Sequence, residues 1–90
     1  MDFGAAVNAL KDGKRISRDA WHGNVFLFLV PGSTFEVTAD RPLGKANPAL
    51  IGQEVTYAPH IDIHCWDGSI SVWAGPDTMS LLAEDWEVVD

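Results

Sequence analysis

The stretch Asn24-Val25-Phe26-Leu27-Phe28-Leu29-Val30-Pro31-Gly32 decides how this chain folds. Six apolar residues in a row lie between an asparagine and a Pro-Gly pair, and such a short β-branched and aromatic run predicts a strand. Because the run does not alternate between apolar and polar residues, we expect both of its faces to be covered. A partner subunit is the economical cover. The alternative is that loops or a helix of the same chain supply it.

A short amphipathic helix is predicted ahead of this strand. Asp2 can cap its start, and Gly13 can end it in a left-handed conformation. A helix of about ten residues is marginal alone, so it must pack against the rest of the fold. Its apolar residues recur at the spacing of a single buried stripe: Phe3, Ala6, Val7 and Leu10.

A hairpin is the clearest signal on the C-terminal side of the strand. Asp67-Gly68 separates two apolar-rich runs, as a two-residue type I′ turn would. Such a turn would pair Ile63 with Val72 and place the aliphatic side chains, with Cys65, on a core face. The other face would then carry a mixed set of side chains: Asp62, His64, Trp66 and Trp73.

Shorter elements complete the predicted fold. Residues 39–53 show no period and contain two prolines, so we expect an irregular functional or interface loop there. The fold class is α+β, with the short N-terminal helix packed on a mainly antiparallel sheet of five or six short strands. Ninety residues form a single domain, 1–90. The remaining elements are strands near 14–20, 35–38, 54–57 and 85–89, and a helical turn over 79–83 that Asp77 can cap.

Composition excludes several classes of partner. The chain carries 13 acidic against 6 basic residues, a formal charge of −7, which argues against nucleic-acid polymers and anionic membranes. No apolar run approaches the roughly 20 residues of a membrane span, and no leader sequence is expected. Cys65 is the single cysteine, so no intrachain disulfide is possible and a reducing, cytosolic setting is the simplest interpretation.

The positive charge is concentrated near the N-terminus. Four of the six cations lie within eight residues of one another, and we call these four the basic strip: Lys11, Lys14, Arg15 and Arg18. The strip is large enough to anchor the phosphates of a small ligand and too small to follow a polynucleotide. The alternative is that it is only a solvated helix end and strand.

Trp21 follows the basic strip in a turn with His22, Gly23 and Asn24. An indole beside Arg18, with backbone amides freed by the glycine, suits a nucleobase and its phosphate. Stacking on such a ring contributes about 1–3 kcal/mol per base. The other three tryptophans are predicted to be core or interface anchors.

The sequence holds no catalytic constellation. His60, Asp62 and His64 lie on one face of a predicted strand, but neighbours on one face are about 7 Å apart, and one ion rarely takes three ligands from a straight strand. Cys65 is expected in the core, and no nucleophile elbow, phosphate loop or dinucleotide fingerprint occurs. We therefore predict a binding protein that is not an enzyme, with no metal and no cofactor.

Motifs along almost the whole chain carry a family resemblance. They are Met1–Ala6, Leu10–Arg18, Trp21-His22-Gly23, Val25–Pro31, Tyr57–Asp62, Asp67-Gly68 with Trp73, and Leu82–Val88. In order and spacing they resemble a family of small phage and prophage proteins, the Thoeris anti-defence proteins of the second type, formerly a domain of unknown function. His22 stands where that family usually has asparagine, and Cys65-Trp66 is atypical of it.

The resemblance implies a sponge for a nucleotide signal. Such a protein tightly binds the cyclic ADP-ribose signal (glycocyclic ADP-ribose) made by bacterial TIR-domain enzymes and does not cleave it. Some relatives also hold cyclic di- or trinucleotides of the CBASS pathway at separate sites, and the family is tetrameric, with pockets between protomers. Two alternatives stay open from the residues alone: a protein-binding module that inhibits a host enzyme, and a small nucleotide hydrolase.

Eight residues are predicted to contact the ligand. Trp21 and Phe3 would stack on or wall the bases, although Phe3 at this helix position can equally belong to the core. Arg18 would meet the phosphates. Asn24 and Asp85 would read base or ribose edges, the alternative for Asp85 being a turn cap. Three side chains after the hairpin would line the same pocket: Trp73, Asp77 and Met79.

Overall fold

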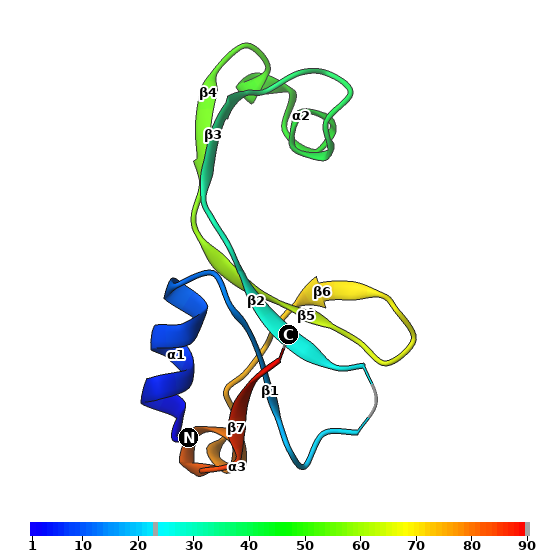
Figure 1. Ribbon diagram of the computed structural model, residues 1–90. Helices are drawn as coiled ribbons and strands as arrows, with labels where there is room; N and C mark the ends of the chain where they lie inside the picture. The colour runs from blue at the N-terminus through cyan, green and yellow to red at the C-terminus, as the bar shows by residue number, and fades with distance from the viewer. Residues whose placement is uncertain (23, 90) are drawn as a thin grey trace.

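A five-stranded antiparallel sheet with strand order β6-β5-β2-β1-β7 forms the body of the molecule (Figure 1). The computed structural model describes residues 1–22 and 24–89. The helices are α1 (Phe3–Lys11), α2 (Pro42–Ala46) and α3 (Thr78–Leu82), with a 3₁₀ turn η1 (Pro48–Leu50). The strands are β1 (Arg15–Arg18), β2 (Phe26–Val30), β3 (Ser33–Glu36), β4 (Glu54–Tyr57), β5 (His60–His64), β6 (Ile70–Val72) and β7 (Trp86–Val89). The predicted α+β class is therefore confirmed.

The predicted apolar strand is β2, and it lies at the centre of the sheet. Leu27 pairs with Ile16 on one side and with Ile63 on the other, and both Leu27 and Ile16 are fully buried. Phe26 and Phe28 point to the opposite face and are only half-buried. This chain therefore covers one face of β2 alone, and the alternative that its own loops or helix cover both faces is not met.

We name the two faces of the sheet from this difference. The covered face carries the core side chains of the strands, and α1 packs there against β1, β2, β7 and α3. Its core cluster consists of Ala6, Leu10, Ile16, Leu27 and Trp86. The open face carries two rows of paired side chains, Phe26–His64–Ile70 and Phe28–Asp62–Val72.

Helix α1 forms as predicted. Oδ1 of Asp2 accepts a hydrogen bond from the Ala5 amide at 2.8 Å, which caps the first turn. Gly13 follows the last turn with φ of +82°, a conformation that a side chain would disfavour. Ala6 and Leu10 are the buried residues of the helix, so its stripe faces the sheet. This docking supplies the stability that so short a helix lacks alone.

The hairpin has a different register from the predicted one. Ile63 pairs with Ser71 rather than with Val72. The Gly68 amide donates to the Cys65 carbonyl at 2.9 Å, and the Cys65 amide donates to the Ser69 carbonyl at 2.8 Å. The connection is thus a three-residue loop, a type I turn completed by Gly68 at φ of +87°.

This one-residue shift moves Trp73 to the other face of the sheet. The type I′ prediction required positive φ at Asp67 as well, and no described non-glycine residue has it. The Trp73 amide donates to the Ile61 carbonyl at 2.9 Å, and the Trp73 side chain packs on the core cluster. The predicted mixed face of Asp62, His64, Trp66 and Trp73 is therefore wrong for Trp73, and for Trp66, which lies in the turn. The predicted aliphatic core face is wrong for Ile70 and Val72, which share the open face with His64 and Asp62.

Residues 39–53 are more ordered than the sequence predicted. They include α2 and η1, each with a proline in its first turn. Gly44 of α2 lies so close to the Thr38 carbonyl that no Cβ would fit, and Val37 is buried beside it. Because these contacts are local, no long hydrophobic period in the sequence could predict the two helical elements.

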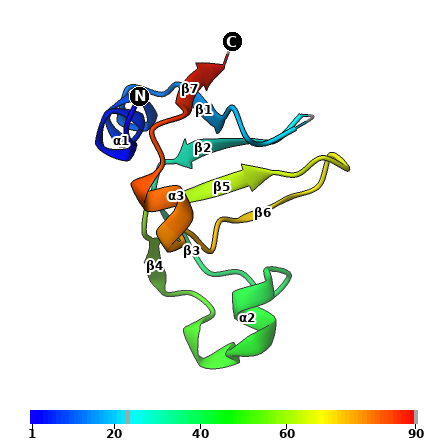
Figure 2. The same ribbon diagram turned by 90° about the horizontal axis from the view of Figure 1, so that it is seen from below.

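β3 and β4 extend the central hairpin away from the body, and we call residues 33–57 the arm (Figures 1 and 2). One register runs from the pair Phe26–His64 to the pair Glu36–Glu54, so β2–β5 and β3–β4 are one ribbon interrupted at residues 31–32 and 58–59. The molecule is consequently 46 Å long and about 26 Å across. In the described part of the chain, no helix is both long and apolar enough to cross a membrane.

Candidate functional site

A pocket of about 800 Å³ opens at the covered side of the sheet. It lies between the turn after β1, the β5–β6 hairpin and the segment that leads into α3. Figure 2 shows α3 and this segment beside β5 and β6. Its walls are mostly apolar and aromatic with a few polar groups, the usual composition of a small-molecule site. Its lining includes Trp21, His22, Ile63, Cys65, Trp73 and Asp77.

Trp86 supports the aromatic walls of this pocket from behind. Its side chain is 2% exposed, and its indole Nε1 donates to the Ser80 carbonyl at 2.9 Å. The Trp21 ring meets it edge-on with centroids 5.2 Å apart, and the Trp73 ring meets it edge-on at 6.3 Å. Edge-to-face packing holds rings at a fixed angle. Two pocket walls are thus pre-oriented by a single buried side chain.

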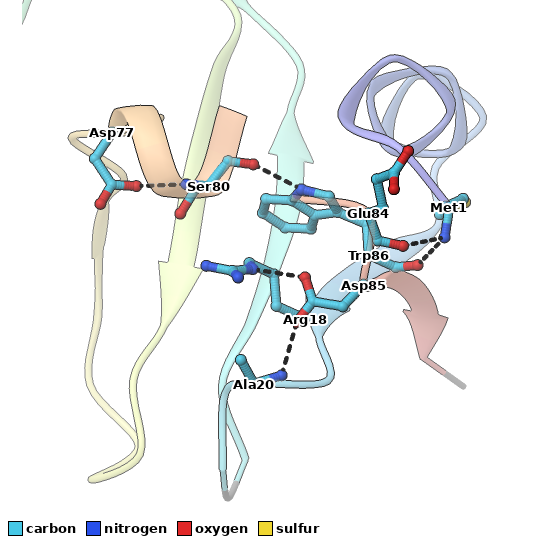
Figure 3. Close-up of polar contacts among 8 residues, drawn as sticks. All are labelled: Met1, Arg18, Ala20, Asp77, Ser80, Glu84, Asp85 and Trp86. Carbon is cyan, nitrogen blue, oxygen red and sulfur yellow. Dashed lines mark hydrogen bonds and ion pairs between the residues drawn. The ribbon is translucent and has the colours of Figure 1, made fainter. Parts of the chain in front are cut away.

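An ion pair fixes the turn that carries Trp21 (Figure 3). Asp85 Oδ1 accepts from Arg18 Nε at 2.8 Å, and Asp85 Oδ2 accepts from the Ala20 amide at 3.0 Å. The Arg18 side chain and then the Ala20 amide hold the pKa of Asp85 below its ordinary value. The Trp21 amide donates back to the Arg18 carbonyl at 2.9 Å. Asp85 therefore joins the end of β1 to the start of β7 directly beside the pocket.

Asp77 is the acidic member of the pocket lining. Its Oδ1 accepts from the Ser80 amide at 3.0 Å and caps α3, as the sequence predicted. Hydrogen bonds from Ser80, and more weakly the charge of Arg18, lower the pKa of Asp77. An ionised carboxylate at this place is an acceptor for hydroxyl or amino groups of a ligand.

The basic strip does not form one surface. Successive side chains of a strand point to opposite faces, so Arg15 and Arg18 are separated by the sheet. The Arg15 guanidinium lies 4.9 Å from the centroid of the Phe26 ring on the open face. The expectation of four cations acting together is therefore wrong, and the side chain from the strip that borders the pocket turn is Arg18.

The eight predicted ligand residues fall into three groups. Trp21, Trp73 and Asp77 line the pocket, while Arg18 and Asp85 pair with each other at its edge. The other three lie outside the lining. Phe3 packs on Trp86 and Trp73. The Asn24 carbonyl contacts His64, and Met79 is 74% exposed. Gly23, expected to free backbone amides in this turn, lies outside the described residues.

Further lining residues were not predicted as ligand contacts, among them Ile63 and Cys65. Both were predicted to lie in a closed aliphatic core, and both border the pocket on the covered side of the sheet instead. The register of the hairpin removes Ile70 and Val72 from that predicted core and places them on the open face. A three-residue loop, which Asp67-Gly68 also suits, is the sequence signal that could have indicated this.

The histidines of β5 are engaged in other contacts. His60 Nε2 lies 3.2 Å from Asp62 Oδ1, and the His64 ring stacks on Phe26 with centroids 4.6 Å apart. His64 Nδ1 lies 2.8 Å from the carbonyl of Asn24. Within residues 1–22 and 24–89, no three His, Cys, Asp or Glu side chains are grouped as metal ligands.

The fold and the pocket define a small α+β domain with one aromatic, ligand-sized site and an ion pair at its rim. The family model of the Thoeris anti-defense 2-like domain matches residues 1–89. The curated protein "Thoeris anti-defense 2" of Bacillus phage SP01 is 34% identical over 90 residues, which cover 99% of this chain and 94% of that protein. The chain therefore belongs to the Thoeris anti-defense 2-like family, as its motifs indicated. Membership supports a role in phage anti-defence.

Proposed function

We propose that this protein sequesters a cyclic ADP-ribose-type immune signal, such as glycocyclic ADP-ribose, without cleaving it. The observation that carries the proposal is the aromatic pocket of about 800 Å³, with Trp21 and Trp73 in its walls and Asp77 at its polar side. A cyclic ADP-ribose offers an adenine ring, ribose hydroxyls and two phosphates. The pocket has a group suited to each of these parts, and family membership supports the same reading.

Each part of the ligand meets a different kind of side chain in this proposal. The indole of Trp21 or Trp73 stacks on the adenine, which contributes about 1–3 kcal/mol. Asp77 accepts from ribose hydroxyls, and Arg18 donates charge-assisted hydrogen bonds to phosphate. A sponge needs a nanomolar dissociation constant, about −12 kcal/mol, to leave little free signal. Stacking and charged hydrogen bonds in one partly enclosed site are suited to that affinity.

The side chains near the pocket favour binding over turnover. Covalent attack would need a nucleophile next to an activating base. Among the described residues, Cys65 has hydrogen bonds only through its backbone, and it has none to His22, the histidine that lines the same pocket. The histidine next to it on β5, His64, points to the open face and contacts the Asn24 carbonyl. We therefore propose a sponge rather than a hydrolase.

The open face supports the proposal that the protein works as a homotetramer. Its rows contain Ile70 and Val72, which are 56% and 65% exposed, and the half-buried Phe26 and Phe28, with His64 and Asp62 between them. Large apolar side chains exposed on a sheet face around a few polar groups are typical of a contact with another subunit. Pockets between protomers, as the resemblance implies, would need a second contact as well, because the open face lies on the opposite side of the sheet from the pocket. Cyclic oligonucleotides of the CBASS pathway are a second proposed ligand class, and the host cytoplasm is the proposed place of action.

A protein-binding module that inhibits a host enzyme is the second candidate. The observation that favours it is the exposure of large side chains on the hairpin and on α3, two elements that border the pocket. Trp66 at the hairpin tip is 80% exposed, and Leu82 on α3 is 73% exposed. Exposed aromatic and aliphatic anchors are the usual centres of protein interfaces.

Calorimetric titration separates these candidates. We expect a cyclic ADP-ribose isomer to bind wild-type protein with nanomolar affinity and to be recovered intact after heat denaturation of the protein. Recovery of a hydrolysed product would make the protein an enzyme, and absence of heat with cyclic ADP-ribose isomers and cyclic dinucleotides alike would reject the nucleotide sponge. Trp21→Ala should weaken binding by about 1–3 kcal/mol. Tyr57→Ala is the matched control, because it removes a half-exposed aromatic ring of the arm outside the pocket.

A further inference from the structure

The two oxygens of Asp85 are both engaged inside the protein. One accepts from Arg18 Nε and the other from the Ala20 amide, at 2.8 and 3.0 Å. Asp85 is therefore poorly placed to read a base or ribose edge while the pair stays intact. Because the pair uses Nε, the two terminal NH₂ groups of Arg18 have no hydrogen bond among the described residues. Figure 3 shows the guanidinium end of Arg18 pointing away from β7, on the same side as Asp77.

We propose that Asp85 is a positioning residue of the ligand site, which aims the terminal NH₂ groups of Arg18 at the ligand phosphates and holds the Ala20 amide so that Trp21 stays against Trp86. This inference rests on the proposed function and assigns a role within that same site. One carboxylate then sets the geometry of two binding groups at once, the phosphate donor and the stacking ring. The buried edge-on contact of Trp21 with Trp86 provides the second anchor of the turn.

This role and a simple charge effect predict opposite results. The ligand carries negative phosphates, and Asp85 is a negative charge beside the site. If its charge were all that mattered, Asp85→Asn would tighten binding, because it removes a repulsion. If Asp85 positions Arg18 and the turn, Asp85→Asn weakens binding although the site becomes less negative. Asparagine cannot accept both hydrogen bonds with two oxygens, since one becomes an NH₂ donor.

The decisive experiment is a calorimetric titration of full-length variants with a cyclic ADP-ribose isomer. Asp85→Asn should weaken binding about tenfold or more. Glu84→Gln is the matched control, since it removes the same charge from the adjacent residue, whose exposed side chain makes no hydrogen bond to the described residues. We expect Glu84→Gln to leave affinity unchanged or to raise it slightly. Arg18→Ala should also weaken binding. In the Arg18→Ala background, the further loss of affinity caused by Asp85→Asn should be much smaller than the loss that Asp85→Asn causes in the wild type.

The Nε–H signal of Arg18 in a proton–nitrogen NMR spectrum gives a readout independent of the ligand. Its hydrogen bond should slow exchange with water in the wild type, and Asp85→Asn should abolish this protection. If the Asp85→Asn protein is too unstable to titrate, the Arg18→Lys protein is titrated instead. Lysine keeps the positive charge and lacks the Nε atom that donates to Asp85. About tenfold weaker binding is then expected, and unchanged affinity would overturn the inference.

The outcomes separate this inference from the function on which it rests. Binding by the wild type that is unchanged or tighter in a folded Asp85→Asn protein overturns the positioning role and leaves the sponge intact. Absence of binding by the wild type to every nucleotide rejects the sponge, and the positioning role is rejected with it. Additive losses from Arg18→Ala and Asp85→Asn would show that the two residues act separately and would also contradict the inference.

Discussion

The two faces of the same five-stranded sheet differ in how far the rest of the chain covers them. On the covered face, α1 and α3 enclose Leu27 and Trp86 and leave one pocket between α3, the hairpin and the turn after β1. On the open face, the alternate side chains of the same strands, such as Phe28 and Val72, face away from this core. The difference teaches that an apolar strand predicts burial but not which partner provides it. On one face the chain covers itself, and on the other we propose that a second copy does.

The largest expected effect breaks the covered face. Trp86→Ala removes a fully packed ring that contacts Phe3, Trp21 and Trp73. We expect a loss of about 3–5 kcal/mol in the free energy of unfolding, measured by urea denaturation. Trp66→Ala is the matched control at an 80% exposed ring and should change stability by no more than about 0.5 kcal/mol. Equal losses in the two variants would mean that the core has been wrongly placed.

The next effect tests the open face. Phe28→Glu places a second carboxylate next to Asp62 in the row Phe28–Asp62–Val72, where a subunit contact would have to bury it. We expect the variant to remain folded by circular dichroism and to run at the monomer mass of 9.8 kDa in light scattering, while the wild type runs as a tetramer. Tyr57→Glu is the matched control, because it places the same charge at a half-exposed aromatic position of the arm, outside both rows. A wild-type protein that is already monomeric would remove the proposed role of the open face.

Particular residues show how far the sequence could predict this fold. The helix cap at Asp2, the central strand and the α3 cap at Asp77 were predicted because each depends on neighbours within a few residues. The hairpin register was not, because Asp-Gly suits both a two-residue and a three-residue loop, and the choice between them depends on Trp73 packing on the core. Tertiary packing decided between two turns of similar local preference.

The candidate site was predictable to a similar depth. Trp21, Trp73 and Asp77 were predicted and do line the pocket. Arg18 was expected as one of four cooperating cations, and alternation along β1 separates it from Arg15. Its pairing with Asp85 joins residues 67 positions apart in the chain. A contact over that separation leaves no local signal, and only the pairing of β1 with β7 creates it.

A smaller effect tests the turn that places Trp73 on the covered face. Gly68 has a φ of +87°, so Gly68→Ala should destabilise the protein by about 1 kcal/mol in thermal unfolding. Gly4→Ala is the matched control within α1, where the backbone is helical and a Cβ would meet only ordinary contacts. It should instead stabilise by about 0.5–1 kcal/mol. Stabilisation by both substitutions would contradict the left-handed turn at Gly68.

The smallest effect concerns pH and the ion pair at the pocket rim. The pKa of Asp85 is lowered by Arg18 and the Ala20 amide, so folding favours its charged form. The stability this provides is present above the ordinary pKa of an aspartate, about 4, and is lost as the pH falls through the lower value of the folded state. We therefore expect unfolding measured between about pH 5 and pH 2 to show a weaker pH dependence in Asp85→Asn than in wild type. An unchanged dependence would contradict the pairing.

Methyl NMR compares the two faces most directly in the presence of ligand. Ile63 lies in the pocket wall on the covered face, and Ile70 lies in a row of the open face. With isoleucine δ-methyl groups labelled, titration of a cyclic ADP-ribose isomer should shift the Ile63 signal strongly and leave the Ile70 signal nearly in place. A strong shift of Ile70 with an unchanged Ile63 would place the ligand on the open face and contradict the account.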